Sequence, residues 1–326
     1  MLMLITGATG KVGRQLIAKA LADGSRPDLR IRALCHNRAL PETDRLSTVR
    51  GSIASRDVVR EAMKGVTHVV HLATCKETPE DVMDVAVKGL FWLLEEMRQS
   101  PTARQFILIG GDASVGHFHV RHGIPLTEQM PHHAYPGCYA LSKVLEEAML
   151  TQYFLQYDLD GCCLRAPWIM EKDDFRHTLS FGDDVFGAPV WKDLVPAGDA
   201  ERYRAEGTVP RLHDRDGRPL KRNFVHVSDL ADAILAALGN PRARQQTFNI
   251  SMNKPVDYGE VADYLAATRG LNAVRIDSAF HSNWLDNTKA RFLLGWEPAY
   301  DMPKLIEDAW SYQRSPDDPR KIWYPG

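Results

Sequence analysis

The stretch that decides the fold lies at the amino terminus and reads Met1-Leu-Met-Leu-Ile5-Thr6-Gly7-Ala-Thr-Gly10-Lys-Val-Gly13. A short apolar run leads into a glycine turn with the spacing GxxGxxG, and residues 15–21 then show helical periodicity. Glycine carries no Cβ, so the chain can turn tightly and a pyrophosphate can approach the backbone amides at the helix start. A purely structural turn is the alternative, but strand, turn and helix in this order favour a dinucleotide site.

Short apolar runs and helical patterns alternate through the first half of the chain. The predicted strands cover residues 2–5, 29–35, 66–72 and 106–109, and the predicted helices cover 15–21 and 82–97. Continuous apolar strands separated by helices indicate a parallel sheet that is covered on both faces. Right-handed crossovers then give a Rossmann-like, doubly wound α/β domain.

The second half of the chain is less regular. We predict helices over 139–157, 229–238, 258–268 and 302–313, strands over 161–167, 224–227 and 247–250, and Ser228 as the cap of the second helix. Residues 171–222 are rich in Asp, Arg, Gly and Pro, which predicts an irregular lobe, and residues 315–326 a surface tail. The dinucleotide-binding domain is therefore expected over 1–170 plus about 221–250, and a smaller substrate lobe over about 171–220 plus 251–326.

Composition narrows the class of protein. The 326 residues are 44% hydrophobic and 25% charged, which excludes a disordered chain, a fibre and a disulfide scaffold. The formal charge of -2 argues against nucleic-acid binding. Five cysteines, an odd number without CxxC spacing, suggest free thiols in a reducing compartment and no metal site. No apolar run is long enough for a membrane span, so we expect a cytoplasmic protein without a membrane partner.

The end of the second predicted strand bears on the choice of cofactor. Folds specific for NAD place an acidic residue there to bind the ribose hydroxyls. This chain has Leu34-Cys-His36-Asn-Arg38, with no carboxylate. His36 and Arg38 can instead meet a 2′-phosphate, although both can equally be solvated loop residues. The segment favours NADP over NAD.

Tyr139-Ala-Leu-Ser-Lys143 is the second chemical signal. The spacing i to i+4 places the phenol and the ammonium on one face of a helix. A lysine beside a phenol favours the phenolate, so the tyrosine can exchange a proton with a substrate hydroxyl or carbonyl. A surface helix face is the alternative, but the position downstream of a dinucleotide turn favours an active site.

With these motifs in this order, the sequence resembles the extended short-chain dehydrogenase/reductase family, the NAD-dependent epimerase/dehydratase group. Further matching segments are His71-Leu-Ala73, Arg165-Ala-Pro167, Arg222-Asn-Phe-Val-His-Val-Ser-Asp229, Lys289-Ala-Arg291 and Leu294-Gly-Trp-Glu-Pro298. The resemblance implies a Rossmann domain and a smaller lobe that holds a nucleotide sugar or another polyol-like substrate. It also implies a homodimer, often formed through a four-helix bundle, here from the helices near 82–97 and 139–157.

Departures from the family pattern concern the catalytic hydroxyl. Gly111 stands where the family usually has Ser or Thr, and Ala86 stands where Asn is common. Ser114 is the nearest hydroxyl, and it either donates to the substrate or merely caps a turn. Asp112 is all that remains of the Thr-Asp-Glu triplet of the dehydratases. Loss of the hydroxyl donor would cost about 10²-fold in rate.

The predicted roles can now be stated. The predicted catalytic residues are Tyr139, Lys143 and Ser114; the cofactor-binding residues are Gly7, Thr9, Gly10, Lys11, Val12, Gly13, His36, Arg38, Ser52, Ile53, Leu72, Ala73, Thr74, Tyr139, Lys143, Pro167 and Trp168; the substrate residues are Asp112, His133 and Arg222. Trp168 either stacks near the nicotinamide or belongs to the core. Arg222 either contacts a substrate phosphate, as the resemblance implies, or forms a salt bridge within the lobe.

Three functions remain open on the sequence. The first is a nicotinamide-dependent oxidoreductase that acts on a hydroxyl or carbonyl of a sugar, sugar acid or nucleotide sugar. The second is a nucleotide-sugar epimerase that retains its cofactor. The third is a dinucleotide-binding regulatory protein with impaired catalysis, which Gly111 and Ala86 favour and the intact Tyr139 and Lys143 oppose.

Overall fold

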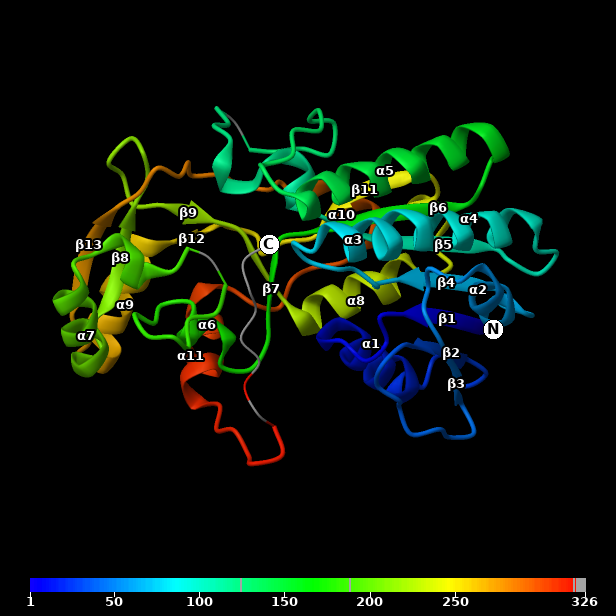
Figure 1. Cartoon of the computed structure of the whole chain (residues 1–326), viewed down its shortest axis with the longest axis horizontal. Helices are drawn as coiled ribbons and strands as arrows, with labels where there is room; N and C mark the ends of the chain where they lie inside the picture. The colour runs from blue at the N-terminus through cyan, green and yellow to red at the C-terminus, as the bar shows by residue number, and fades with distance from the viewer. Residues whose placement is uncertain (124, 188, 319, 321–326) are drawn as a thin grey trace.

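The computed structural model describes residues 1–123, 125–187, 189–318 and 320. Within these residues, a parallel seven-stranded sheet has the order β11-β6-β5-β4-β1-β2-β3 (Figure 1). Its strands are β1 (Leu2–Thr6), β2 (Arg30–Cys35), β3 (Leu46–Arg50), β4 (His68–His71), β5 (Gln105–Gly111), β6 (Gly161–Ala166) and β11 (Gln246–Asn249). The order reverses between β1 and β4, as in a doubly wound sheet. The predicted Rossmann-like fold is confirmed.

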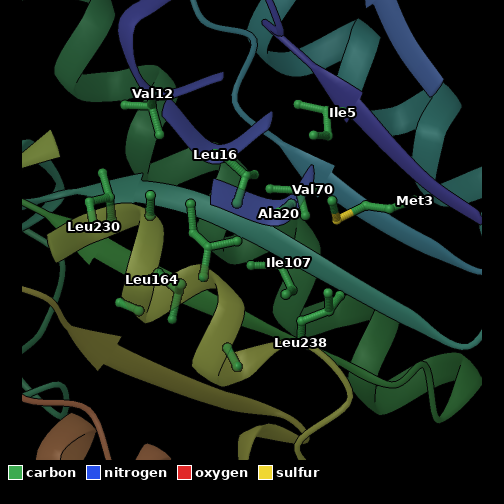
Figure 2. Close-up of a cluster of buried hydrophobic side chains, with 14 of the residues drawn as sticks. Met3, Ile5, Val12, Leu16, Ala20, Val70, Ile107, Leu164, Leu230 and Leu238 are labelled. Atoms are coloured by element: carbon green, nitrogen blue, oxygen red, sulfur yellow. The ribbon is translucent and has the colours of Figure 1, made fainter. Parts of the chain in front are cut away.

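Strand β1 shows why both faces of the sheet are covered. Met3 and Ile5 join the buried cluster with α1 (Lys11–Ala22) and α8 (Val227–Ala237), as Figure 2 shows. Leu4, between them, joins the cluster of the opposite face. That face is covered by α2 (Arg56–Met63), α4 (Gly89–Gln99) and α5 (Cys138–Tyr157). Because side chains alternate along a strand, a continuous apolar run can only be buried by helices on both sides.

Two elements of this domain were not predicted from the sequence. Strand β3 lies at the edge of the sheet, and only Leu46 of its five residues is buried. Helix α2 has eight residues, of which four are charged. Strand β3 carries no apolar alternation, because a half-exposed edge strand needs few apolar side chains. Helix α2 does bury Val59, Ala62 and Met63 on one face, but it is only eight residues long.

Two predicted helix boundaries require correction. The helix expected over 82–97 consists of α3 (Pro79–Val82), the π-helical segment η1 (Met83–Lys88) and α4. Helix α8 begins at Val227, and its cap is His226, whose ring nitrogen accepts the N–H of Ser228. The prediction of Ser228 as the cap is therefore wrong. Because the helix begins at Val227, the cap position falls on residue 226, and Ser228 lies within the first turn.

The second lobe is built from pairs of short strands. They are β7 (Trp168–Met170) with β10 (Phe224–His226), β8 (Val209–His213) with β13 (Ala273–Asp277), and β9 (Lys221–Arg222) with β12 (Val256–Asp257). Helices α6 (Asp174–His177), α7 (Ala197–Glu206), α9 (Tyr258–Arg269) and α11 (Met302–Ser311) accompany them. Aromatic side chains fill its core, among them Phe175, Trp191 and Phe224. The segment 171–222 thus holds one ten-residue helix, α7, that its composition does not reveal.

The carboxyl-terminal part of the chain returns to the sheet. Helix α10 (Thr288–Leu294) and Trp296 pack into the same cluster as α1 and α8, although residues after 251 were expected in the substrate lobe. The start of the predicted tail is held in place, because Asp318 accepts hydrogen bonds from Lys172 and Tyr312 at 2.7 and 2.6 Å. Residues 319 and 321–326 of that tail lie outside the described residues. Of the helices in the described ranges, none has the length and apolar character needed to span a membrane.

Candidate functional site

A cavity of about 260 Å³ lies at the carboxyl ends of β1, β4, β5 and β6. This is the edge of the sheet where the strand order reverses, and open α/β sheets bind ligands there. Thirteen of the predicted site residues line it: Gly7, Gly10, Lys11, Val12, Gly13, Leu72, Thr74, Asp112, Tyr139, Lys143, Pro167, Trp168 and Arg222. The tertiary structure thus brings both predicted motifs and part of the second lobe around one space.

The glycine turn forms one wall of this cavity. Gly7 has a φ of +64°, and a Cβ at Gly7 would lie 2.8 Å from the backbone nitrogen of Ala73. A Cβ at Gly13 would lie 2.6 Å from the backbone of Ala8, so both glycines are required by close packing. A Cβ at Gly10 would meet only the carbonyl oxygen of Gly7, at 3.2 Å. Gly10 caps α1 without a side-chain hydrogen bond and leaves space beside the helix start, which suits a pyrophosphate.

Thr6 connects this turn to the neighbouring strand. Its hydroxyl oxygen accepts the N–H groups of Leu72 and Ala73, both at 3.1 Å, and lies 2.8 Å from Nδ1 of His71. Burial, together with the charge of Lys143, lowers the pKa of His71 to about 3, so the ring is neutral. The carboxyl ends of β1 and β4 are therefore fixed relative to each other at the cavity edge.

Tyr139 and Lys143 lie in the first turns of α5. The carboxylate of Glu77 accepts the N–H groups of Cys138 and Tyr139 at 2.9 and 3.4 Å, so a residue from another segment caps this helix. The Lys143 ammonium is buried and donates to Glu146 at 2.7 Å and to the Ile109 carbonyl at 3.4 Å. Burial alone would lower the pKa of Lys143, but Glu146 raises it above its ordinary value. The lysine is therefore charged beside the phenol.

Gly111 faces this pair directly. A Cβ at Gly111 would lie 3.7 Å from the Tyr139 hydroxyl and 3.8 Å from Cδ of Lys143. Both distances are ordinary van der Waals contacts, so the position has room for a small side chain. The hydroxyl that the family pattern has at this position is thus missing beside the tyrosine.

Ser114 does not take its place. It is fully buried, lies outside the cavity lining, and its hydroxyl is 2.8 Å from Glu147 and 2.9 Å from the Gly111 carbonyl. The short turn η2 (Asp112–Val115) directs it toward the buried side of α5. Of the two sequence interpretations of Ser114, the geometry favours the structural one.

Glu147 organises a buried cluster behind the cavity. Its carboxylate accepts from Arg165 at 2.7 Å and contacts Nε2 of His132 at 3.2 Å, in addition to Ser114. Burial would raise the pKa of Glu147, but the hydrogen bonds from His132 and Arg165 lower it to about 2. This ion pair joins α5 to β6 and keeps Tyr139 in place against the sheet.

The opposite wall carries a chain of three polar side chains. Oδ2 of Asp112 lies 2.6 Å from Nδ1 of His117, and Nε2 of His117 lies 3.0 Å from a terminal nitrogen of Arg222. The Arg222 guanidinium lies 3.8 Å from the ring centroid of Trp168. Trp168 itself stacks on Phe186, with ring centroids 5.5 Å apart. Trp168 therefore both lines the cavity and packs on the lobe core, so the two interpretations of this residue are compatible.

Eight predicted residues lie outside the cavity lining: Thr9, His36, Arg38, Ser52, Ile53, Ala73, Ser114 and His133. His36 and Arg38 are exposed after β2. Ile53 is buried against Gly89 of α4, so it supports the site from behind.

Several lining residues were not among the predicted site residues, among them Lys76, His117, Phe118, His119 and Tyr135. Lys76 lies 3.8 Å from the centroid of the Tyr139 ring. It follows the carboxyl end of β4 by five residues, which was the signal available for it. His119 lies between aromatic rings, and burial lowers its pKa to about 4. Over the described ranges, no three His, Cys, Asp or Glu residues gather in a way that could hold a metal ion.

Comparisons with known proteins agree with this geometry. A UDP-glucose 4-epimerase of Mycolicibacterium smegmatis is 26% identical over 317 residues, which cover 90% of this chain and 93% of the relative. A UDP-glucose 4-epimerase of Neisseria meningitidis serogroup C is 23% identical over 339 residues, covering 95% and 96%.

Solved structures show the same fold. A short-chain dehydrogenase/reductase superfamily protein from Agrobacterium tumefaciens with bound NAD superposes with a TM-score of 0.77 at 22% identity, covering 95% of this chain and 96% of its own. The UDP-glucose 4-epimerase of Thermotoga maritima with UDP-glucose gives 0.71 at 19% identity, covering 95% and 98%. The family described as NAD dependent epimerase/dehydratase matches residues 3–170, more than half of the chain. The protein therefore belongs to the NAD-dependent epimerase/dehydratase family.

Proposed function

We propose that this protein oxidises a hydroxyl of a nucleotide sugar to a ketone and re-reduces the same carbon, with Tyr139 as the acid–base. The supporting observation is that Tyr139, Lys143 and the glycine turn line one cavity. The names of the relatives that span the chain, UDP-glucose 4-epimerases, favour re-reduction in place over release of an oxidised product. A dehydrogenase that releases a sugar ketone or acid would use the same residues.

The lining of the cavity supports a nicotinamide dinucleotide as its occupant. Gly10 leaves the open face that a pyrophosphate needs, and Lys11, Leu72 and Thr74 continue the lining toward Tyr139. We propose that these residues hold the cofactor, which supplies the hydride acceptor when bound. NAD is the cofactor that the family name implies, and the preference for NADP based on His36 and Arg38 remains a proposal.

The chain's own residues supply the proton chemistry. Tyr139 accepts the hydroxyl proton at its phenolate oxygen as the carbon is oxidised, and it returns that proton on reduction. Lys143 stabilises the phenolate through its charge, and Glu146 holds this ammonium from the other side at 2.7 Å. Arg222, which lines the cavity beside Trp168, is our candidate for binding an anionic group of the substrate.

A binding-only regulator is the second candidate. Gly111 removes the hydroxyl beside Tyr139, and Lys143 is engaged by a buried carboxylate. The missing hydroxyl at Gly111 weakens catalysis without affecting the glycine turn, whereas the contact between Lys143 and Glu146 is compatible with either candidate. The two candidates differ in whether hydride ever leaves a substrate.

The test is a hydride-transfer screen. The purified protein is incubated with NAD or NADP and one sugar per reaction. The sugars are UDP-glucose, UDP-galactose, UDP-glucuronic acid and free uronic acids. Absorbance at 340 nm reports transient or released reduced cofactor, and chromatography reports epimers. Epimer formation without net reduced cofactor supports the proposal, whereas stoichiometric reduced cofactor identifies a dehydrogenase. Tight cofactor binding with no transfer to any of these sugars would favour the regulator.

We also propose a cytoplasmic homodimer formed through α4 and α5. Large apolar side chains are exposed on these helices, including Phe91 at 39%, Leu141 at 48% and Leu155 at 73%. All five cysteines are free thiols, as expected in a reducing compartment. Light scattering of the wild type and of Leu141→Glu tests the interface, since a dimer built on this face should dissociate in the variant.

A further inference from the structure

We propose that His117, oriented by Asp112, is a second base in the cavity that removes the C–H proton beside the ketone carbon. The inference rests on the proposed function, because oxidation of the substrate hydroxyl creates the ketone that acidifies this C–H bond. The activity it adds is enolisation of the keto sugar. It allows proton exchange or inversion of configuration at the carbon next to the ketone carbon, whose own hydroxyl exchanges its proton with Tyr139.

Hydrogen bonding defines the tautomer of His117. A guanidinium has donors only, so Nε2 of His117 accepts from Arg222 at 3.0 Å. Nδ1 therefore carries the proton and donates to the Asp112 carboxylate at 2.6 Å. Burial lowers the pKa of His117 and outweighs the effect of Asp112, so the ring is neutral in this state. A neutral imidazole with its lone pair on Nε2 and an anion at Nδ1 is a general base.

The backbone holds this arrangement in an unusual conformation. His117 has a φ of +47°, in the left-handed region, and follows Gly116 with a φ of +89°. Non-glycine residues in this region are strained and tend to persist where function requires them. Asp112 and His117 are each 8% exposed, yet both line the cavity. The strained turn thus holds a buried dyad at the surface of the site.

The lone pair on Nε2 determines which proton transfers His117 can perform. In this tautomer Nε2 has no hydrogen, so it cannot donate to a ketone and cannot replace the hydroxyl missing at Gly111. It can only accept a proton, and the hydroxyl proton already goes to Tyr139. The C–H beside the carbonyl becomes acidic once the ketone has formed, and Nε2 of His117 can accept that proton. The two proton transfers need two bases in one cavity. Among the described residues, Tyr139 and His117 both line it.

The step balances without a further reagent. Nε2 of His117 takes the proton, the C–H electron pair forms the carbon–carbon double bond of the enolate, and the carbonyl electrons move to oxygen. Lys143 and the protonated Tyr139 stabilise that oxygen. The imidazolium formed is neutralised by Asp112, and reprotonation of carbon restores the ketone. An anionic substrate group drawn to Arg222 would release Nε2 from its present hydrogen bond.

The experiment measures solvent deuterium in the sugar. The protein, NAD and UDP-glucuronic acid or UDP-glucose are incubated in D₂O, and carbon-bound deuterium in the recovered nucleotide sugar is counted by mass spectrometry. We expect incorporation in the wild type, and a loss of about 10²-fold or more in His117→Asn. Asn tolerates a positive φ, so the turn should survive this change. His122→Asn, in the same loop but outside the cavity lining, is the matched control and should incorporate normally.

The outcomes separate the two proposals. Hydride transfer without any deuterium in the wild type overturns the role of His117 and leaves the proposed function intact. Incorporation that persists in His117→Asn overturns it as well. Absence of hydride transfer on both sugars contradicts the proposed function and, with it, this inference. A measurement that needs no turnover is ¹⁵N NMR of the His117 ring, where a proton on Nε2 near neutral pH would refute the assigned base.

Discussion

The two walls of the cavity differ in what builds them. The cofactor wall, Gly7 to Gly13, is made by one continuous turn whose shape depends on absent side chains. The substrate wall joins Asp112, His117 and Arg222, and the last two lie 105 residues apart in the sequence. The cofactor wall is formed by residues close in sequence and carries a sequence motif, whereas the substrate wall forms only where the two lobes meet in the folded chain. Substitutions should therefore act through the backbone on one wall and through individual charges on the other.

Removal of the Tyr139 hydroxyl should have the largest effect. Tyr139→Phe keeps the ring that packs on Ala113 and Ala140, so folding and cofactor binding should survive. General acid–base catalysis contributes about 10²–10⁴-fold, and turnover should fall by that factor. Steady-state assays on the substrate found in the screen measure it. Ser114→Ala is the matched control and should keep turnover near wild type; an equal loss there would return Ser114 to the catalytic set.

Glu147→Gln should produce the largest loss of stability. It leaves the buried Arg165 without its anionic partner, which typically costs about 3–5 kcal/mol. Because the pKa of Glu147 falls from 4.5 to about 2 on folding, its contribution is complete above pH 4.5 and is lost as pH decreases toward 2. Denaturant titrations at pH 7 and pH 3 measure both effects. A variant as stable as the wild type at pH 7 would show that the cluster is not stabilising.

Gly111→Ser tests whether the site lacks a hydroxyl hydrogen-bond donor beside Tyr139. The added side chain has room beside Tyr139, with its Cβ at 3.7 Å from the hydroxyl. If a substrate oxygen lies there, turnover should rise by up to about 10²-fold. Gly111→Ala has the same Cβ without the hydroxyl and serves as the control. A fall in turnover in both variants would mean that the substrate itself occupies this space.

Gly10→Val and Gly13→Val should separate binding from folding on the cofactor wall. At Gly10 the side chain enters the space of the pyrophosphate, and a steric cost of about 1–3 kcal/mol lowers cofactor affinity by about 5- to 150-fold with little loss of stability. At Gly13 the side chain clashes with Ala8, so the protein should be destabilised. Calorimetric titration and thermal melting distinguish the two. Full cofactor affinity in Gly10→Val would contradict the assignment of this turn.

Arg38→Ala should have the smallest effect. The side chain is exposed, and exposed charge pairs contribute about 0–1 kcal/mol. We expect NADP affinity to fall by up to about fivefold while NAD affinity stays the same. Side-by-side dissociation constants test this, and tighter binding of NAD by the wild type would refute the preference for NADP.

The substrate wall also explains why part of the site could not be predicted. Arg222 was predicted because it lies in a segment typical of the family, but its partner His117 was not among the predicted site residues, because no carboxylate stands beside it in the sequence. That carboxylate is Asp112, five residues earlier, and it reaches His117 only because Gly116 and His117 both adopt positive φ. No periodic pattern encodes such a turn.

By itself the sequence determined the doubly wound sheet, the glycine turn and the Tyr139–Lys143 face, because each depends on local spacing or on apolar alternation that only one arrangement can bury. Tertiary structure alone decided that Ser114 points to Glu147, that His226 caps α8, and that Glu146 holds Lys143. These outcomes depend on which polar group is nearest after packing, and hydrogen bonds between distant segments have no signature in one sequence. The chemistry of the substrate wall therefore became visible only in three dimensions.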